Sequence, residues 1–146
     1  MKCITNNGLK LLKQFEGFSN KIYLDSAGLP TIGYGHLITP AEKHLFKHGI
    51  TEAEAISLLK QDVAIAENAV SRLINAPLNN HQFDALVSFT FNLGSGALQR
   101  STLRAKVNRE EHAEVPAEFL RWVYAGGRKV PGLIKRRKME ADLYAS

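Results

Sequence analysis

The sequence predicts an α+β fold with a small lobe built on a β-hairpin, a long connecting helix and a larger helical lobe. Apolar residues recur at helical spacing through most of the chain after residue 51, whereas short β-type runs and glycines fill residues 17–38. The first amphipathic stretch after residue 51 exceeds twenty residues, which is long enough to join two lobes. The expected boundaries are about 15–50 for the small β-containing lobe, about 51–75 for the connecting helix, and 1–14 with 76–146 for the helical lobe.

The N-terminal part predicts a short helix followed by the hairpin. Three leucines and a phenylalanine between Gly8 and Phe15 give one apolar side, and we expect Asn6 or Asn7 to cap this helix. Ile22–Leu24 and Thr31–Tyr34 are β-type runs on either side of a tight turn rich in Asp, Gly and Pro. These two runs therefore predict an antiparallel strand pair.

Capping boxes predict where three helices begin: Thr39–Glu42, Thr51–Glu54 and Asn79–Gln82. In each box a polar cap residue is followed three residues later by Glu or Gln, which can satisfy the free N–H groups of the first turn. The second helix should end near Asn75, because Pro77 cannot continue it.

The C-terminal half predicts several further helices. One should run from about His81 to Leu93 and stop at the glycines Gly94 and Gly96. Others are expected near Gln99–Asn108, Glu111–Tyr124 and Leu133–Tyr144, with Pro116 breaking or restarting the middle one.

Composition narrows the function classes before any motif is considered. A chain of 146 residues can bury a core without disulfides or a structural metal, and its one cysteine, Cys3, excludes an intrachain disulfide. No segment is apolar enough to span a membrane, and the first seven residues contain no apolar signal-peptide core. We therefore expect synthesis in a reducing cytoplasm and no stable membrane anchor.

The net charge of +5 is distributed unevenly along the chain. Residues 1–99 are neutral, whereas residues 100–138 contain 11 basic and 4 acidic side chains. Such a segment favours a polyanionic partner, namely nucleic acid, an anionic membrane or an acidic wall polymer, although a solvated basic face is an equal alternative. Within it, Lys135–Lys138 is interpreted as the polar face of a terminal helix.

The hairpin region contains the residues with the most specific chemistry. Glu16 lies where the first helix should end, Asp25 follows at the turn, and Thr31 lies on the returning strand. Helix carbonyls and neighbouring phenylalanines favour a protonated Glu16, while an exposed turn favours an ionised Asp25. Two carboxyl groups in such different environments are typical of acid–base cleavage of a glycosidic bond, and the Thr31 hydroxyl is suited to hold a water.

Each of these residues also has a structural interpretation. Two carboxyl groups nine residues apart are usually solvated surface charges. Asp25 can cap its own turn, and Thr31 can serve only as a strand residue.

The combination of motifs distinguishes these interpretations. Glu16-Gly17-Phe18, Tyr23-Leu24-Asp25-Ser26-Ala27-Gly28 and Pro30-Thr31-Ile32-Gly33-Tyr34-Gly35-His36 closely resemble the phage-type lysozymes, the endolysins of tailed bacteriophages. Downstream, similar segments are Gln82–Leu86, Phe91–Gly94, Ser101–Leu103, Arg121-Trp122, and Gly132-Leu133 with Arg136-Arg137 and Glu140. The resemblance covers essentially the whole chain and implies a mainly helical, lysozyme-like fold.

The resemblance also implies an activity and roles for individual residues. Family members hydrolyse the β-1,4 bond between N-acetylmuramic acid and N-acetylglucosamine in peptidoglycan, which lyses the host cell. Glu16 would then be the general acid, and Asp25 and Thr31 would position the attacking water, with inversion at the anomeric carbon. Leu37, Phe91 and Thr102 would contact substrate. Pro116 departs from the family pattern and receives no role, and His36 is expected to pair with an acidic residue.

The resemblance sets expectations for partners as well. Peptidoglycan is the expected partner of a monomer, with no cofactor, no metal and no nucleic acid, and a separate holin-type pore would carry the protein from the host cytoplasm to the wall. Three alternatives remain open: a lytic transglycosylase, which needs Glu16 but no water held by Asp25 and Thr31, a non-enzymatic nucleic-acid module using the basic segment, and an inactive wall-binding protein.

Overall fold

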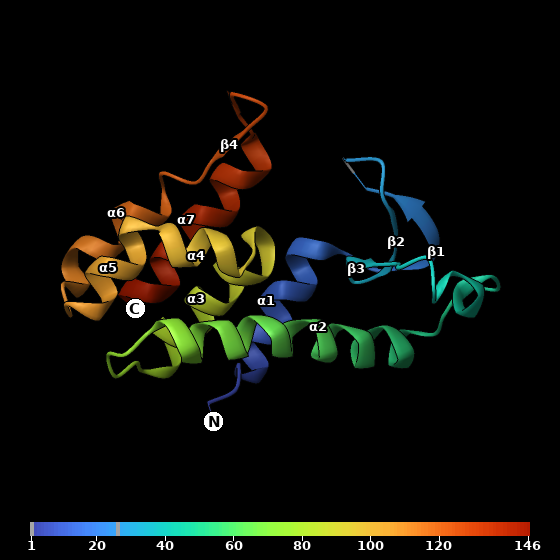
Figure 1. The fold of residues 1–146 in the computed structure, drawn as a ribbon, viewed down its shortest axis with the longest axis horizontal. Helices are drawn as coiled ribbons and strands as arrows, with labels where there is room; N and C mark the ends of the chain where they lie inside the picture. The colour runs from blue at the N-terminus through green and yellow to red at the C-terminus, as the bar shows by residue number, and fades with distance from the viewer. Residues whose placement is uncertain (1, 26) are drawn as a thin grey trace. The chain divides into compact units, whose positions relative to one another are not determined.

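The computed structural model describes residues 2–25 and 27–146, so Met1 and Ser26, the latter within the predicted turn, lie outside the described residues. Contacts divide the chain into two compact units. Unit 1 comprises Met1–Leu9 with Ile65–Ser146, and unit 2 comprises Lys10–Ala64. Figure 1 labels the helices α1–α7 and the strands β1–β4. The architecture is α+β, as predicted, because helices dominate unit 1 and unit 2 contains a small antiparallel sheet.

Unit 2 is built around three strands in the order β1-β2-β3. β1 (Ser19–Leu24) and β2 (Pro30–Gly33) form the predicted hairpin, and β3 (His36–Leu37) adds a short third strand that the sequence did not reveal. The strands are antiparallel, with a bulge in β1 that shifts the register between Ser19 and Tyr23. Downstream of the bulge, Tyr23 faces Thr31 across the pair, so their side chains share one face of the sheet.

The sheet is held by a small apolar core. Ile32, Ile38 and Phe46 are buried together, with Ile50 and Leu58 packed against them. Phe46 ends η1 (Lys43–Phe46), a 3₁₀ helix. This short helix replaces the α-helix predicted from the Thr39–Glu42 box: Glu42 accepts the Thr39 N–H at 2.9 Å, but the same oxygen also binds His36.

The other two capping boxes form as predicted. Thr51 and Glu54 exchange bonds of 2.9 and 3.1 Å at the start of α2 (Glu52–Leu73), a helix of 22 residues that ends close to the expected position. Its apolar face is buried at Leu59, Val63, Ala66, Val70 and Leu73. Asn79 and Gln82 form both bonds of the box that opens α3 (Asn80–Leu93).

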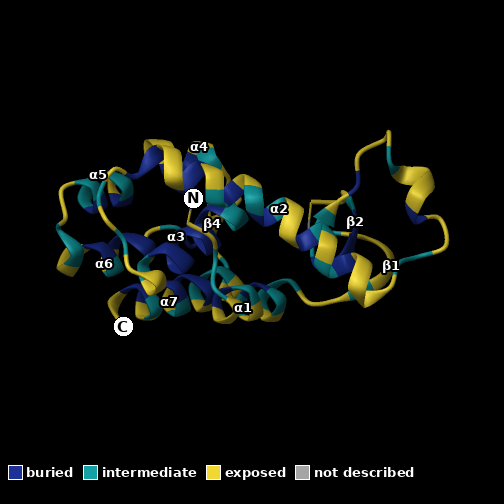
Figure 2. Cartoon of the chain, turned by 90° about the horizontal axis from the view of Figure 1, so that it is seen from below, coloured by how far each residue is buried: buried dark blue, intermediate teal, exposed yellow. Residues whose placement is uncertain are grey.

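α3 lies at the centre of unit 1. Every residue from Phe83 to Thr90 is buried, which requires neighbours on all sides, and Figure 2 shows the helix largely in the colour of buried residues. α7 (Pro131–Ala145) packs along it, and α6 (Val115–Phe119) packs on α7. Gly94, with φ of 92°, ends α3 as predicted.

Several predicted helices are divided or replaced by other elements. The segment predicted as Gln99–Asn108 forms α4 (Ser95–Arg100) and α5 (Thr102–Asn108), because the Ser101 side chain caps α5 by accepting the Arg104 N–H. Pro116 lies in the first turn of α6, which follows η2 (His112–Glu114), so the predicted break is confirmed. The end of that predicted helix is instead a hairpin of β4 (Tyr124–Ala125) and β5 (Arg128–Lys129). Its Gly126–Gly127 turn has φ of 58° and 77°, which glycines adopt without strain.

Two smaller predictions are wrong. The first helix, α1 (Asn6–Glu16), is capped by Thr5 and not by Asn6 or Asn7, since the Thr5 hydroxyl accepts the Gly8 N–H at 3.1 Å. The run Lys135–Lys138 is not uniformly a solvated face, because Arg136 and Arg137 are buried. Both arginines form ion pairs with the buried Glu140, so this carboxylate and not water compensates their charges.

Candidate active site

Glu16 is the last residue of α1, where the sequence predicted it. Gly17 follows with φ of +68° and donates its N–H to Lys13 O at 2.9 Å, which ends the helix in the left-handed conformation that glycine favours. Phe18 follows, immediately before β1 begins at Ser19. Its ring packs on the Tyr34 ring, with the two centroids 5.4 Å apart. The position of Glu16 is therefore set by the end of a helix and the start of the sheet.

Gly35 places the β2–β3 turn against the Glu16 carboxyl group. Its φ is +75°, and a Cβ atom built on it would overlap Glu16 Oε1 and lie 3.2 Å from Glu16 Cδ. The Glu16 carboxyl group would have to shift to admit a side chain at this position, and the positive φ itself favours glycine. Sequence reasoning did not assign Gly35 this role, although it identified the glycine as part of a motif.

Asp25 stabilises the hairpin turn with both its backbone and its side chain. Its Oδ1 accepts the N–H groups of Ala27 and Leu29, each at 2.9 Å, and its own N–H donates to Leu29 O at 2.9 Å. The structural interpretation of Asp25 as a turn cap is thus confirmed. Ala27, Gly28 and Leu29 are exposed while Asp25 itself is half-buried, so its carboxylate is held at a defined position beside solvent.

Thr31 lies on β2 and is only 3% exposed. Its hydroxyl donates to Leu29 O at 2.9 Å, which commits the hydroxyl hydrogen and leaves the oxygen lone pairs directed elsewhere. Because Asp25 bonds to the N–H of Leu29 and Thr31 to its carbonyl, one residue of the turn orients both side chains.

Tyr23 is a residue of this site that sequence reasoning missed. It faces Thr31 across the strand pair. Burial and then the negative charges of Glu16 and Asp25 raise the pKa of its hydroxyl above the ordinary value of 10.0. The sequence feature that could have indicated Tyr23 as a site residue is its position in the Tyr-x-Asp motif, two residues before Asp25. Its phenol therefore stays protonated over the neutral range, as a hydrogen-bond donor close to both carboxyl groups.

His36 has the structural pairing expected of it. Its Nδ1 lies 2.8 Å from Asp62 Oδ2 and its Nε2 lies 2.9 Å from Glu42 Oε1. Burial opposes a charge on the ring, but the hydrogen bonds and charges of Asp62 and Glu42 outweigh it and raise the pKa of His36 above 6.5. The imidazole ring of His36, a residue of β3, thus connects Asp62 of α2 with Glu42, the residue before η1.

The three residues predicted to contact substrate belong to different units. Leu37, in unit 2, is 50% exposed on β3 and pairs with Thr31 in the sheet register. Phe91 is half-buried near the end of α3, and Thr102 is exposed at the start of α5, both in unit 1. Their roles in binding stay predictions.

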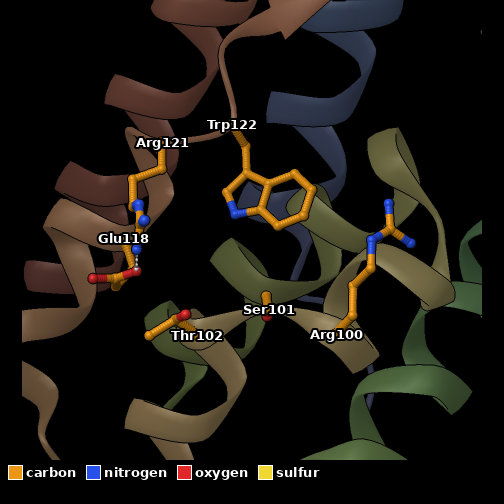
Figure 3. A pocket seen from close by; sticks show the side chains of 6 residues that line it. All are labelled: Arg100, Ser101, Thr102, Glu118, Arg121 and Trp122. Atoms are coloured by element: carbon orange, nitrogen blue, oxygen red, sulfur yellow. Dashed lines mark hydrogen bonds and ion pairs between the residues drawn. The ribbon is translucent and has the colours of Figure 1, made fainter.

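Thr102 lines a pocket of about 280 Å³ in unit 1. Figure 3 shows it together with the other lining residues, Arg100, Ser101, Glu118, Arg121 and Trp122. Trp122 is half-buried, packs edge-on against Phe89 with ring centroids 5.5 Å apart, and also borders this pocket. The neighbouring Phe119 is fully buried.

The donor groups of the described chain do not suggest a metal centre. Among residues 2–25 and 27–146, no group of three or more His, Cys, Asp or Glu side chains could hold a metal ion. Over the same residues, no helix is long and apolar enough to cross a membrane.

Comparison with known proteins identifies the family. A model of the family described as "Phage lysozyme" matches residues 13–140. The endolysin of Salmonella phage P22 is 39% identical, with 100% of each chain covered. The endolysin of Bacillus phage B103 is 38% identical over 97% of this chain, which spans 53% of that longer protein. Among solved structures, the endolysin from Escherichia coli O157:H7 phage FAHEc1 has a TM-score of 0.88 at 37% identity, covering 98% of this chain and 93% of that one.

The family match covers the segments that contain the candidate residues. It includes the end of α1, the hairpin and α3 through most of α7, and the solved structure confirms the lysozyme-like fold expected from the sequence. The chain therefore belongs to the phage lysozyme family, whose members are peptidoglycan-hydrolysing enzymes.

Proposed function

We propose that this lysozyme cleaves the β-1,4 bond between N-acetylmuramic acid and N-acetylglucosamine, with Glu16 as the general acid and Asp25 and Thr31 positioning the attacking water. One observation carries the proposal. Burial and then the charges of Glu16 and Asp25 raise the pKa of Tyr23, and Tyr23 is paired with Thr31 across β1 and β2, which supports grouping the three residues in one site.

Glu16 supplies the proton that the leaving sugar needs. As the glycosidic C–O bond breaks, the carboxylic acid donates its proton to the bridging oxygen, which avoids the release of an alkoxide. Gly35 packs against Oε1 of this carboxyl group and so restricts its orientation. Proton transfer requires a heavy-atom approach of about 2.6–3.2 Å, so restricted orientation contributes directly to the rate.

Asp25 and Thr31 suit the task of holding a water. The Thr31 hydrogen is committed to Leu29 O, so the Thr31 oxygen can accept a hydrogen bond from water. Asp25 Oδ1 already accepts hydrogen bonds from two N–H groups. We therefore propose that the water donates its second hydrogen to Asp25 Oδ2. A water donating both hydrogens in this way turns a lone pair toward the anomeric carbon, and Asp25 takes its proton as the new C–O bond forms.

Turnover of purified peptidoglycan by the wild type and by Glu16→Gln tests the assignment. We expect reducing-end muropeptides from the wild type and a loss of at least about 100-fold in kcat for Glu16→Gln. Mass spectrometry identifies the products, and NMR of the first-formed anomer tests inversion. Anhydro-muropeptides would instead identify a lytic transglycosylase and remove the water-holding role of Asp25 and Thr31.

The substrate-contacting residues extend the proposal. We assign Leu37, Phe91 and Thr102 to sugar binding, which rests on the family resemblance and, for two of them, on exposure. Leu37→Ala and Thr102→Ala should raise KM with little change in kcat, because they remove contacts made equally before and during reaction. An unchanged KM in both variants would contradict the assignment.

We also propose that the protein is a monomer that acts on the wall after a separate holin-type pore opens the membrane, as the family resemblance implies. Sedimentation of the purified chain tests the first statement. Expression in bacteria with and without an independent membrane pore tests the second: lysis is expected only when the pore is present.

A further inference from the structure

A second pocket, on unit 2, is separate from the residues assigned to catalysis. Its volume is about 400 Å³, and it is lined by Lys21, Ile22, Phe46, Lys47, His48 and Gly49. Lys21 and Ile22 belong to β1, while the other four residues come from the end of η1 and the loop that follows it. The pocket therefore lies where this loop meets the first strand of the sheet.

The backbone around this pocket is fixed by close contacts. Ile50 donates its N–H to Asn20 O at 3.0 Å, and Gly49 donates to Phe46 O at 3.0 Å. Gly49 has a φ of +84°, and a Cβ atom built on it would overlap Asn20 O. Because the loop can approach β1 this closely only with glycine, the lysines on the two sides of the pocket are attached to a defined frame.

The pocket is cationic and lacks internal counter-ions. None of its lining residues is acidic. Lys21, Lys47 and His48 are exposed, and in the described part of the chain none of them forms an ion pair. By contrast, Lys106, Arg109 and Arg121 all pair with glutamates. Two lysines facing one concave site without a carboxylate favour an anionic ligand.

The other side chains of the pocket are apolar. Phe46 is 7% exposed and belongs to the small core, and Ile22 is partly exposed beside it. A site with an apolar floor and a cationic rim suits a ligand that carries carboxylates next to small apolar groups. A polyol phosphate has the charge but not the apolar groups. The peptides attached to the glycan of peptidoglycan have both, since alanine methyl groups alternate with free carboxylates along them.

We propose that this pocket binds a carboxylate-bearing peptide stem of peptidoglycan through Lys21 and Lys47, with Ile22 and Phe46 contacting an alanine side chain. The inference rests on the proposed function, because it names a second part of the same substrate. It adds a peptide-recognition site to a protein whose assigned residues recognise and cleave sugar. The pocket would hold the wall polymer by a group that is unchanged by the reaction.

Direct titration tests this site without turnover. The Glu16→Gln protein, labelled with ¹⁵N, is titrated with a synthetic stem tetrapeptide and, separately, with the same peptide bearing amidated carboxylates. We expect the amide signals of Ile22 and Gly49 to shift with the free acid and not with the amide. The Lys21→Gln/Lys47→Gln pair should weaken binding by about fivefold, because exposed charge pairs contribute modestly.

Matched controls make the result decisive. Lys10→Gln/Lys60→Gln removes the same charge from two exposed lysines of the same unit that do not line the pocket, and should leave the affinity unchanged. Equal loss in both double variants would show only general charge attraction and overturn the proposal. Tighter binding of glycerol phosphate oligomers than of the peptide would overturn it in favour of a phosphate site, and an absence of shifts would remove the site altogether.

The outcome is distinguishable from failure of the proposed function. With peptidoglycan as substrate, Lys21→Gln/Lys47→Gln should raise KM and leave kcat unchanged, since the lysines lie outside the reacting groups. If Glu16→Gln retained full turnover, the catalytic assignment would fall while the titration still decided the peptide site. If turnover behaved as expected and the titration gave no shifts, only the peptide site would fall.

Discussion

Gly35 and Glu16 are in direct contact: a Cβ atom on Gly35 would stand 3.2 Å from the Glu16 carboxyl carbon and overlap its Oε1. A turn between two short strands therefore helps to position the carboxyl group of the proposed acid. The contact joins residues nineteen positions apart, so the glycine acts on the carboxyl group through space and not through the local chain.

Gly35→Ala should damage catalysis beyond its effect on stability. The added methyl group must displace the Glu16 carboxyl, and a displacement of about 1 Å can cost 10- to 100-fold in kcat. Gly127→Ala is the matched control, because Gly127 has a φ of +77° with no atom within 4 Å of the added Cβ. Both variants should lose about 1–3 kcal/mol of unfolding free energy from backbone strain. Only Gly35→Ala should lose kcat, and equal activity in the two would contradict the contact's role.

Asp25→Asn separates the two tasks of Asp25. Asparagine keeps an oxygen that can accept the N–H groups of Ala27 and Leu29, so the turn should persist with stability changed by less than about 0.5 kcal/mol. The missing charge should lower kcat by about 100-fold or more, because the water loses its base. Asp25→Ala should lose the activity and a further ~1 kcal/mol of stability, since both N–H groups lose their acceptor. Urea unfolding and peptidoglycan turnover measure the two effects, and full activity in Asp25→Asn would refute the catalytic role.

The pKa of Tyr23 reports the two carboxyl groups independently of activity. Negative charge from Glu16 and Asp25 helps to raise it, so it should fall in Glu16→Gln and again in Asp25→Asn. Titration of ¹³Cζ-labelled tyrosine by NMR, with the signal assigned through Tyr23→Phe, measures it. Tyr144, whose pKa burial raises to about 12, serves as an internal reference that neither variant should move. A Tyr23 value unchanged in both variants would show that the carboxyl groups do not face it.

Sequence was a good guide where local chemistry decides the structure. The Thr51–Glu54 box opens a helix because it satisfies N–H groups within its own turn, and the helix then runs 22 residues along a regular apolar face. The Thr39–Glu42 box has the same pattern, yet only a 3₁₀ turn follows. There Glu42 also binds His36, and the chain must reach the close approach of Gly49 to Asn20 a few residues later. Tertiary contacts overrode an identical local signal.

The candidate site also combines features that local sequence predicts with features that depend on tertiary contacts. The motif predicts Glu16, Asp25 and Thr31 as candidate catalytic residues, which stays a prediction, and the end of α1 and the hairpin lie where the pattern predicted them. The contact with Gly35 and the electrostatic coupling of Tyr23 could not be predicted, because they depend on how the end of a helix meets the sheet. The buried arginines of α7 escaped prediction for a related reason: charges three and four residues apart look alike in a sequence whether water or protein surrounds them.

His36 should make stability depend on pH in a predictable direction. Its pKa is higher in the folded protein than the ordinary value of 6.5, so the folded state binds the proton more tightly. The resulting stabilisation is fully present below pH 6.5 and is lost as pH rises through the folded-state pKa. His36→Asn should therefore lose more unfolding free energy at about pH 5.5 than at about pH 9.

Urea unfolding of His36→Asn at both pH values measures this difference. His44→Asn is the control, because His44 is exposed on η1 and forms no ion pair within the described residues. If His36→Asn lost the same unfolding free energy at both pH values, His36 would stabilise the fold by packing and not by its charge.

Glu140 should be the most costly carboxylate in unit 1 to remove. It is fully buried, with Oε1 2.7 Å from Arg137 Nε and Oε2 accepting the Ser88 hydroxyl at 2.5 Å. Glu140→Gln leaves the buried guanidinium of Arg137 without its counter-charge, so we expect a loss of about 3–5 kcal/mol of unfolding free energy. Glu111→Gln, which removes the half-buried partner of the exposed Arg109, should cost at most about 1 kcal/mol. The triple variant Arg136→Met/Arg137→Met/Glu140→Leu should recover part of the loss, because both guanidinium groups that contact Glu140 are removed together with it. A triple variant less stable than Glu140→Gln would show that the hydrogen bonds of this cluster outweigh its desolvation.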